Sequence, residues 1–238
     1  MPGRHRASRA VTPQGRGRFG DFDVLDSVGE WDEVTARTVL ARLSLPSELS
    51  FFTAEEAGLA RPLVDLLLEQ DDEPRIPVLE LIDARLVAAE TDGWHYDELP
   101  EDGAAWRISL RHLDDDARGT APGSGFAHLT AAAQAGIVQS VQDLAGASGS
   151  WHGWPAEHVW NLWTRYVCTA FYSHPWAWNE IGFPGPAYPR GYVNPGLDAR
   201  ERWERPDLVD ADPVPFARRV EAARHRHAGL VGREETGG

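Results

Sequence analysis

The chain has 238 residues, of which 42% are hydrophobic and 25% are charged, as is typical of a soluble globular protein. The formal net charge of −14 argues against nucleic acid as a partner, because phosphate binding needs clustered cations. The one cysteine, Cys168, excludes an intrachain disulfide, and no apolar run is long enough to form a transmembrane helix.

The first 28 residues are polar and basic, and we expect them to form a flexible tail. Gly15, Gly17 and Gly20 spell G-x-G-x-x-G, but they follow Pro13 in an arginine-rich stretch and not a strand, so a dinucleotide site is disfavoured. This segment has neither the apolar stretch of a secretory signal nor paired arginines. The chain as written is therefore expected to be cytoplasmic.

Helical periodicity follows across residues 29–228. A first helix is expected over 31–43, with Val39, Leu40 and Leu43 on its buried face. Thr53 and Glu56 form a capping-box pattern that opens a helix to about residue 70. The apolar face of this second helix is formed by Leu59, Leu63, Leu66 and Leu67.

Five more helices are predicted after an acidic turn. Pro77 suits the first position of the next helix, and Trp106, Leu110 and Leu113 mark another at 104–113. Further helices are expected over 129–144 (Ile137, Val141 and Leu144 on one face), over 156–172 after a turn at 151–155, and over 215–227 before a polar tail at 229–238. The 156–172 helix is apolar on several sides, which indicates a central, buried position. Since no alternating strand pattern is present, the sequence predicts an irregular all-α single domain.

The segment 174–196 contains five prolines, four glycines and five aromatic residues. Prolines remove backbone donors and glycines weaken regular elements, so we expect a long loop that is neither helix nor strand. Its aromatic content argues against disorder. Interface cores are enriched in Trp, Tyr and Arg, which favours a docking surface, but an intramolecular lid remains open as an alternative.

Candidate catalytic groups are few and scattered. Cys168 lies in an apolar helical run and is expected to be a buried, inert thiol. A metal site can be imagined from His152, His158, His174 and Glu180, and a stand-alone metal-dependent enzyme is therefore one alternative. The spacing of the first two histidines does not place both rings on one helical face, which favours structural histidines.

Tryptophans offer a second alternative, a carbohydrate-binding protein with a stacking platform. The candidates are Trp154, Trp160, Trp163, Trp176 and Trp178. Helical spacing of Trp160 and Trp163 is more typical of a core, and carbohydrate-binding modules are usually rich in strands.

The run from Phe171 to Tyr192, and above all IGFPGPAYPRGY at 181–192, resembles the C-terminal signature of the gluconate 2-dehydrogenase subunit 3 family. A weaker similarity extends over about residues 30–210, including RERWERPD at 200–207. The resemblance implies a small subunit without flavin that associates with a large FAD-dependent oxidoreductase of the glucose–methanol–choline class. The large subunit of such complexes oxidises a sugar, a sugar acid or a polyol, and electrons leave through a cytochrome c subunit where one is present.

In this family the small subunit is required for maturation and often carries a twin-arginine signal that exports both proteins. Because this chain has no such signal, a cytoplasmic pairing is expected. The resemblance implies no independent catalysis and no direct membrane insertion, with FAD bound by the partner and no cofactor in this chain. The expected partner-binding residues comprise aromatic anchors, two charged contacts and a histidine that fixes the start of the loop by hydrogen bonding: Trp176, Trp178, Phe183, Tyr188, Tyr192, Arg190, Glu180 and His174.

Overall fold

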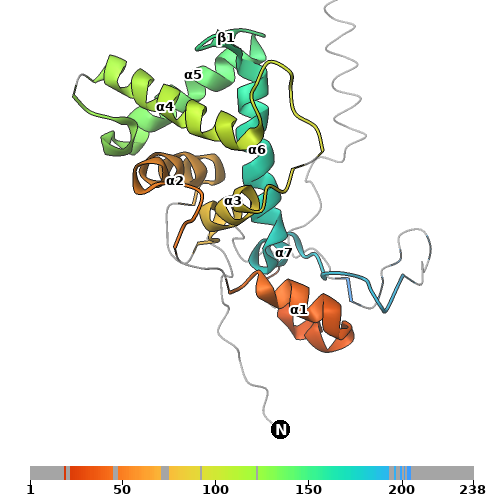
Figure 1. The fold of residues 1–238 in the computed structure, drawn as a ribbon. Coiled ribbons are helices and arrows are strands. Elements are labelled where there is room, and N and C mark those ends of the chain that lie inside the picture. The colour runs from red at the N-terminus through yellow and green to blue at the C-terminus, as the bar shows by residue number, and fades with distance from the viewer. Residues whose placement is uncertain are drawn as a thin grey trace, which may run out of the picture.

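The computed structural model describes Phe19, residues 22–44, 48–70, 75–91, 93–121 and 123–192, and five later residues, Gly196, Ala199, Glu201, Trp203 and Glu204. The elements in chain order are η1 (Val24–Glu30), α1 (Glu33–Ala41), α2 (Ala54–Leu68), α3 (Val78–Val87), α4 (Asp102–Thr120), η2 (Phe126–His128), α5 (Ala131–Gly146), β1 (Ser150–Trp151), β2 (Trp154–Pro155), α6 (Ala156–Ser173) and α7 (Pro175–Ile181). The described part of the chain is mostly helical (Figure 1), which confirms the predicted all-α class. The glycine motif at 15–20, the helix predicted over 215–227 and the tail at 229–238 lie outside the described residues.

Helix α2 shows how local sequence determines a boundary. The hydroxyl of Thr53 accepts the Glu56 amide at 3.2 Å, and the Glu56 carboxylate accepts the Thr53 amide at 3.0 Å. This reciprocal capping box satisfies donors that the first turn leaves without helical partners, and it confirms the predicted start. Leu59 and Leu63 are buried, and the helix ends at Glu69 in a left-handed conformation.

Helix α6 is the centre of the main bundle. It packs against α2, α3, α4 and α5, and Figure 1 shows it running along the whole group. Trp163 and Tyr166 are fully buried on it, and Trp106 of α4 is buried against Tyr166 at a ring distance of 5.9 Å. The prediction of a central helix is confirmed.

Three details of the bundle differ from the prediction. Cys168 is exposed and not buried, and Thr169 and Tyr172 near it on α6 are exposed too. Leu144 is also exposed, at the C-terminal end of α5. The turn at 151–155 contains two short antiparallel strands, with Trp151 opposite Trp154. They are joined by His152 and Gly153, both with positive φ, as the tightest hairpin turns require.

A second, smaller hydrophobic cluster lies beyond the C-terminal end of α6. It combines buried Phe22, Val24, Trp31, Val39 and Trp178. We call residues 22–44 and 174–192 the outer lobe, and Figure 1 shows its helices α1 and α7 below the main bundle. The packed chain thus begins ahead of the boundary expected at residue 29, since Phe22 and Val24 are buried.

The outer lobe corrects two further expectations. Leu40 and Leu43 are exposed, so only Val39 of the predicted apolar face of α1 is buried. The predicted loop 174–196 begins with helix α7, seven residues long. Pro175 is tolerated there because the first helical residue needs no amide donor, and Gly182 ends the helix with φ of 67°.

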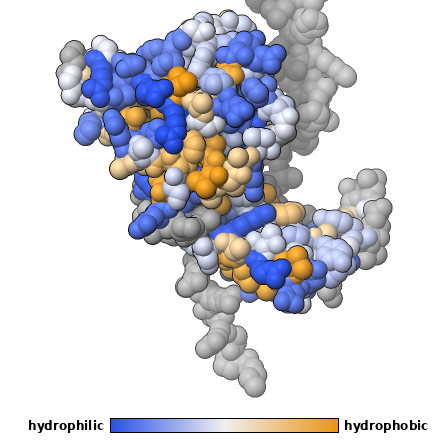
Figure 2. All heavy atoms as spheres, viewed as in Figure 1, coloured by the Kyte–Doolittle hydropathy of each residue, from blue (hydrophilic) through white to orange (hydrophobic). Residues whose placement is uncertain are grey.

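No helix within the described residues has the length and apolar character needed to span a membrane. The surface seen in Figure 2 is mixed, with an apolar region over α2 and α3 and both kinds of side chain on the outer lobe.

Candidate functional site

His174 joins α6 to α7 and caps the shorter helix. Its Nδ1 accepts the backbone N–H of Trp176 at 3.2 Å, and the side chain is buried. Burial, together with the positive charge of Arg42, lowers the pKa of His174 from 6.5 to about 4. The ring is therefore neutral at pH 7, as an accepting nitrogen requires.

Trp178 lies inside the chain, only 6% exposed. Its indole N–H donates to the carbonyl of Tyr172 at 2.6 Å, and the guanidinium of Arg42 lies 5.8 Å from the ring centroid. Phe183 meets the same ring edge-on at 5.4 Å. Trp178 therefore connects α7 to the end of α6 and to α1.

Asn179 ties α7 to the beginning of the described chain. Its side-chain oxygen accepts the amide of Val24 at 2.7 Å, and its Nδ2 donates to the Asp23 carboxylate at 3.3 Å. Asn179 is buried, and it was not among the residues predicted to form the site. The sequence feature that could have indicated this role is a polar amide side chain in the middle of an aromatic run.

The segment after α7 folds back over η1. Gly185 has φ of 77°, and a Cβ there would come within 2.5 Å of the Trp31 ring, so the close contact requires glycine. Arg190 donates to the Glu30 carboxylate and to the carbonyl of Pro184, both at 2.9 Å. Its guanidinium also lies 4.6 Å from the Trp203 ring centroid. The charge of Arg190 is thus used within the chain.

The outward face of the same segment is different. Ile181, Tyr188 and Tyr192 are 51%, 66% and 62% exposed. On α1, Val34, Leu40 and Leu43 are also exposed. Large apolar side chains in water concentrate on this lobe, and we call Ile181, Tyr188 and Tyr192 the aromatic rim.

The structure therefore divides the residues expected to bind a partner. His174, Trp178 and Arg190 have buried side chains with internal contacts. The half-buried members are Trp176, Glu180 and Phe183, and the exposed members are Tyr188 and Tyr192. The inner face of this segment is buried within the chain, and its outer face carries exposed side chains, so docking and an intramolecular lid both stay predictions.

The imagined metal ligands are not brought together. His152 and His174 lie at opposite ends of α6, whose 18 residues span roughly 27 Å at the usual helical rise. His152 pairs with Asp116 at 2.8 Å, and His158 stacks on Tyr96 at a ring distance of 3.7 Å. Within the described ranges no three potential ligands cluster in a metal-binding arrangement.

The five candidate tryptophans do not form an exposed platform. Trp163 is fully buried and donates to the Ser109 hydroxyl at 2.9 Å, and Trp178 is buried in the outer lobe. The other three, Trp154, Trp160 and Trp176, pack against the main core. The most exposed tryptophan among the described residues is Trp94, which was not among the predicted candidates.

The fold and surface define a small all-α protein with two apolar clusters and an exposed aromatic rim. A family model, Gluconate 2-dehydrogenase subunit 3, matches residues 54–185, which is more than half of the chain. The chain therefore belongs to this family. The match runs from the start of α2 to Gly185, and it leaves out η1 and α1. Searches of curated proteins and of solved structures found no match.

Proposed function

We propose that this chain is an accessory subunit, without flavin of its own, that binds a large FAD-dependent dehydrogenase acting on a sugar, a sugar acid or a polyol. Its family supports membership of a multi-subunit dehydrogenase. In this proposal FAD belongs to the partner, and a cytochrome c subunit accepts the electrons where the complex has one.

The observation that carries the proposal is the aromatic rim. Tyr188 and Tyr192 are the most exposed large hydrophobic side chains in the described chain, and Ile181 lies on the same segment. Tyrosine is enriched at interface hot spots because its ring is large, rigid and polar at one end.

The buried side chains of the segment 174–192 hold the aromatic rim in one conformation before a partner binds. Asn179 fixes the segment to Asp23 and Val24 through a part-buried and a buried hydrogen bond, and Arg190 adds an exposed hydrogen bond to Glu30. A surface that is already ordered loses less conformational entropy on association. Trp178 and His174 therefore shape the rim from below, and the exposed tyrosines make the contact.

Binding at this rim stabilises the large subunit by mass action. A partner that binds only the folded state adds RT ln(1 + [L]/Kd), about 2.7 kcal/mol at a hundredfold excess over Kd. This is sufficient to account for a maturation role without catalysis by the accessory chain.

Co-expression with an FAD-dependent large subunit from the same genome tests the proposal. The wild-type chain should co-purify with the flavoprotein and raise its flavin content. The double variant Tyr188→Ala/Tyr192→Ala should weaken the complex roughly thirty-fold, since a hot spot contributes about 2 kcal/mol or more. Trp94→Ala, which removes an exposed aromatic from the loop between α3 and α4, is the matched control.

The variants must keep the wild-type melting temperature, because all three side chains are exposed. Equal affinity of the double variant and the wild type would place the contact elsewhere. Full flavin loading of the large subunit without this chain would refute the accessory role.

A further inference from the structure

The aromatic rim alone is too small for a stable subunit interface. Such an interface buries roughly 800 Å² on each partner. The three rim side chains are between 51% and 66% exposed, and even a completely exposed aromatic side chain buries only about 150–250 Å², so the rim provides about half of that area at most. A large subunit bound at the rim must therefore contact a neighbouring surface as well.

Helix α1 provides an apolar surface next to the rim. Among the described residues, ten large hydrophobic side chains are exposed, and six of them lie on the outer lobe. Three of these six form the rim. The other three lie on α1 or directly after it: Val34, Leu40 and Leu43. Figure 2 shows apolar as well as polar side chains over α1. Exposed apolar side chains that gather in one region are typical of a docking surface.

The rim is joined to the start of α1. Arg190, which lies between Tyr188 and Tyr192 in the sequence, donates to the Glu30 carboxylate at 2.9 Å. Val34 follows Glu30 by only four residues and is 57% exposed. The exposed surface of the rim therefore continues onto α1, and one partner can cover both.

One face of α1 points outward along its whole length. Val34, Arg37, Thr38 and Ala41, which are at i, i+3, i+4 and i+7, are all exposed. Val39 points the other way and is buried in the same cluster as Trp178. The inner face thus holds the helix to the outer lobe, and the outer face is available to a partner.

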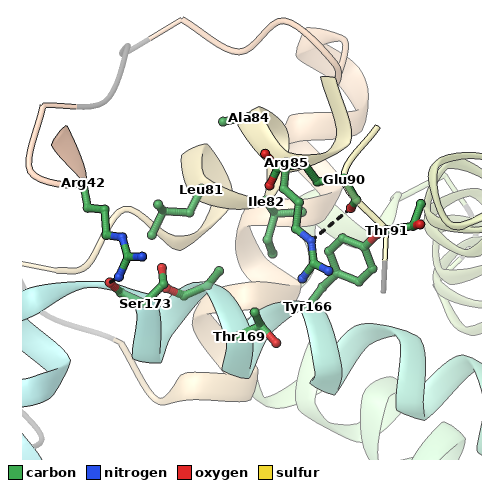
Figure 3. A pocket seen from close by; sticks show the side chains of 11 residues that line it. Arg42, Leu81, Ile82, Ala84, Arg85, Glu90, Thr91, Tyr166, Thr169 and Ser173 are labelled. Carbon is green, nitrogen blue, oxygen red and sulfur yellow. Dashed lines mark hydrogen bonds between the residues drawn. The ribbon is translucent and has the colours of Figure 1, made fainter. Parts of the chain in front are cut away.

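Arg42 fixes the end of α1 to the main bundle. Its guanidinium donates to the carbonyl of Ser173, at the end of α6, at 2.9 Å and lies 5.8 Å from the Trp178 ring centroid. Figure 3 shows Arg42 beside Ser173 at one end of the open cleft between α3 and α6. Because Trp178 also connects α7 to the bundle, the same ring supports both α1 and the rim. A surface that is held in place before binding loses less conformational entropy on association.

We propose that the outward face of α1 is a second contact with the large subunit, which covers it together with the aromatic rim. The inference rests on the proposed function and adds the chemistry of the contact. An apolar patch of the large subunit packs against Val34, Leu40 and Leu43. Burial of apolar area drives such a contact, so salt does not screen it as it screens exposed charges.

The double variant Val34→Gln/Leu40→Gln of the full chain, co-expressed with the large subunit, tests this contact. Glutamine is a good helix former, so α1 should keep its structure. The matched control is Val87→Gln/Leu144→Gln, which removes a valine and a leucine of similar exposure from α3 and α5 of the main bundle. Dilution of the co-purified complex, followed by size-exclusion chromatography, measures the affinity.

The α1 variant should bind the large subunit roughly tenfold more weakly than the wild type, as expected for the loss of two partly exposed apolar side chains. The factor should be the same at about 0.1 M and about 0.5 M NaCl, because an apolar contact is not screened. The control variant should bind as the wild type does.

Hydrogen exchange gives a second measurement that needs no variant. In the wild-type complex, the amides of α1 and α7 should be more protected than in the free chain, because the partner covers the outer lobe. The amides of α5, which carries one of the control substitutions, should not change.

Equal affinity of the α1 variant and the control would overturn the proposal, and so would unchanged protection of α1 in the wild-type complex. If the complex still depends on Tyr188 and Tyr192 in either case, the accessory role stands without the α1 contact. A wild-type chain that binds no large subunit would refute both. If the free wild-type chain is a dimer that Val34→Gln/Leu40→Gln converts to monomers, a second copy covers α1 and the proposal is wrong.

Discussion

The main bundle and the outer lobe are built in different ways. The bundle packs regular helices around α6, and each helix contributes apolar residues at helical spacing. The outer lobe packs a 3-10 helix, two short helices and a proline-rich segment. Its cluster of buried residues is small: Phe22, Val24, Trp31, Val39 and Trp178.

The outer lobe depends on specific polar contacts more than the main bundle does. Regular helices satisfy their own backbone and need mainly an apolar stripe to pack. Short, irregular segments cannot satisfy all their backbone groups internally. The outer lobe therefore uses single polar links, such as Asn179 to Val24 and Arg190 to Glu30. These links fix the aromatic rim, and we expect the lobe to open before the bundle does.

The largest loss of stability is expected from Trp163→Ala in the bundle. The ring is fully buried, and its N–H donates to the Ser109 hydroxyl, so truncation leaves a cavity and removes one hydrogen bond of that hydroxyl. Large-to-small changes of this kind cost about 3–5 kcal/mol, a large part of the stability of a typical domain. Chemical denaturation measures the loss, and Trp94→Ala should change stability by less than about 0.5 kcal/mol.

Trp178→Ala should cost about 3 kcal/mol, and the loss should be confined to the outer lobe. Its ring connects α7 with Tyr172 and Arg42, but it does not belong to the main core. Hydrogen exchange should speed up in η1, α1 and α7 while α2 to α5 keep their protection. Equal loss of protection in both regions would show that bundle and lobe unfold as one unit.

The bundle could be predicted because its signals are local. The capping box of Thr53 and Glu56 and the spacing of Trp106, Leu110 and Leu113 predicted elements and buried faces that the structure confirms. Periodicity could not identify which side of α6 is exposed, and for this reason Cys168 was wrongly expected to be buried.

The outer lobe could not be predicted because its contacts are remote in sequence. Asn179 and Val24 are 155 positions apart, and no local pattern joins them. Composition identified the segment 174–196 as important, but Trp and Arg serve a buried lid as well as an interface. The same enrichment therefore covered both the buried Trp178 and the exposed Tyr188.

The pH dependence of stability should reflect the protonation of His174 in the outer lobe. Its pKa is about 4 in the folded chain and near 6.5 when unfolded, so the unfolded state binds the proton more tightly. Stability is then complete above about pH 6.5 and falls as the pH drops toward 4, by roughly 3 kcal/mol at most. Melts across this range should show a shallower fall for His174→Asn, which can still cap α7 but does not titrate.

His112, in the main bundle, also contributes to the pH dependence of stability and can be compared with His174. Burial first, and then the charge of His152, lowers the pKa of His112, so it contributes in the same direction. Part of the fall should therefore persist in His174→Asn. An unchanged slope in that variant would contradict the burial of His174 as the main cause.

The smallest expected loss of stability comes from Asn179→Ala, and it distinguishes the outer lobe from the main bundle. Asn179→Ala leaves the buried Val24 amide without its acceptor, which should cost about 1–2 kcal/mol. The matched change in the bundle is Asn161→Ala, whose amide donates to the Tyr96 hydroxyl at 2.7 Å. Asn161 and Tyr96 are both half-buried, so water can replace the lost bond and the cost should be smaller. If the two variants lose equal stability, the polar links of the lobe are no more important than those of the bundle, and packing alone fixes the aromatic rim.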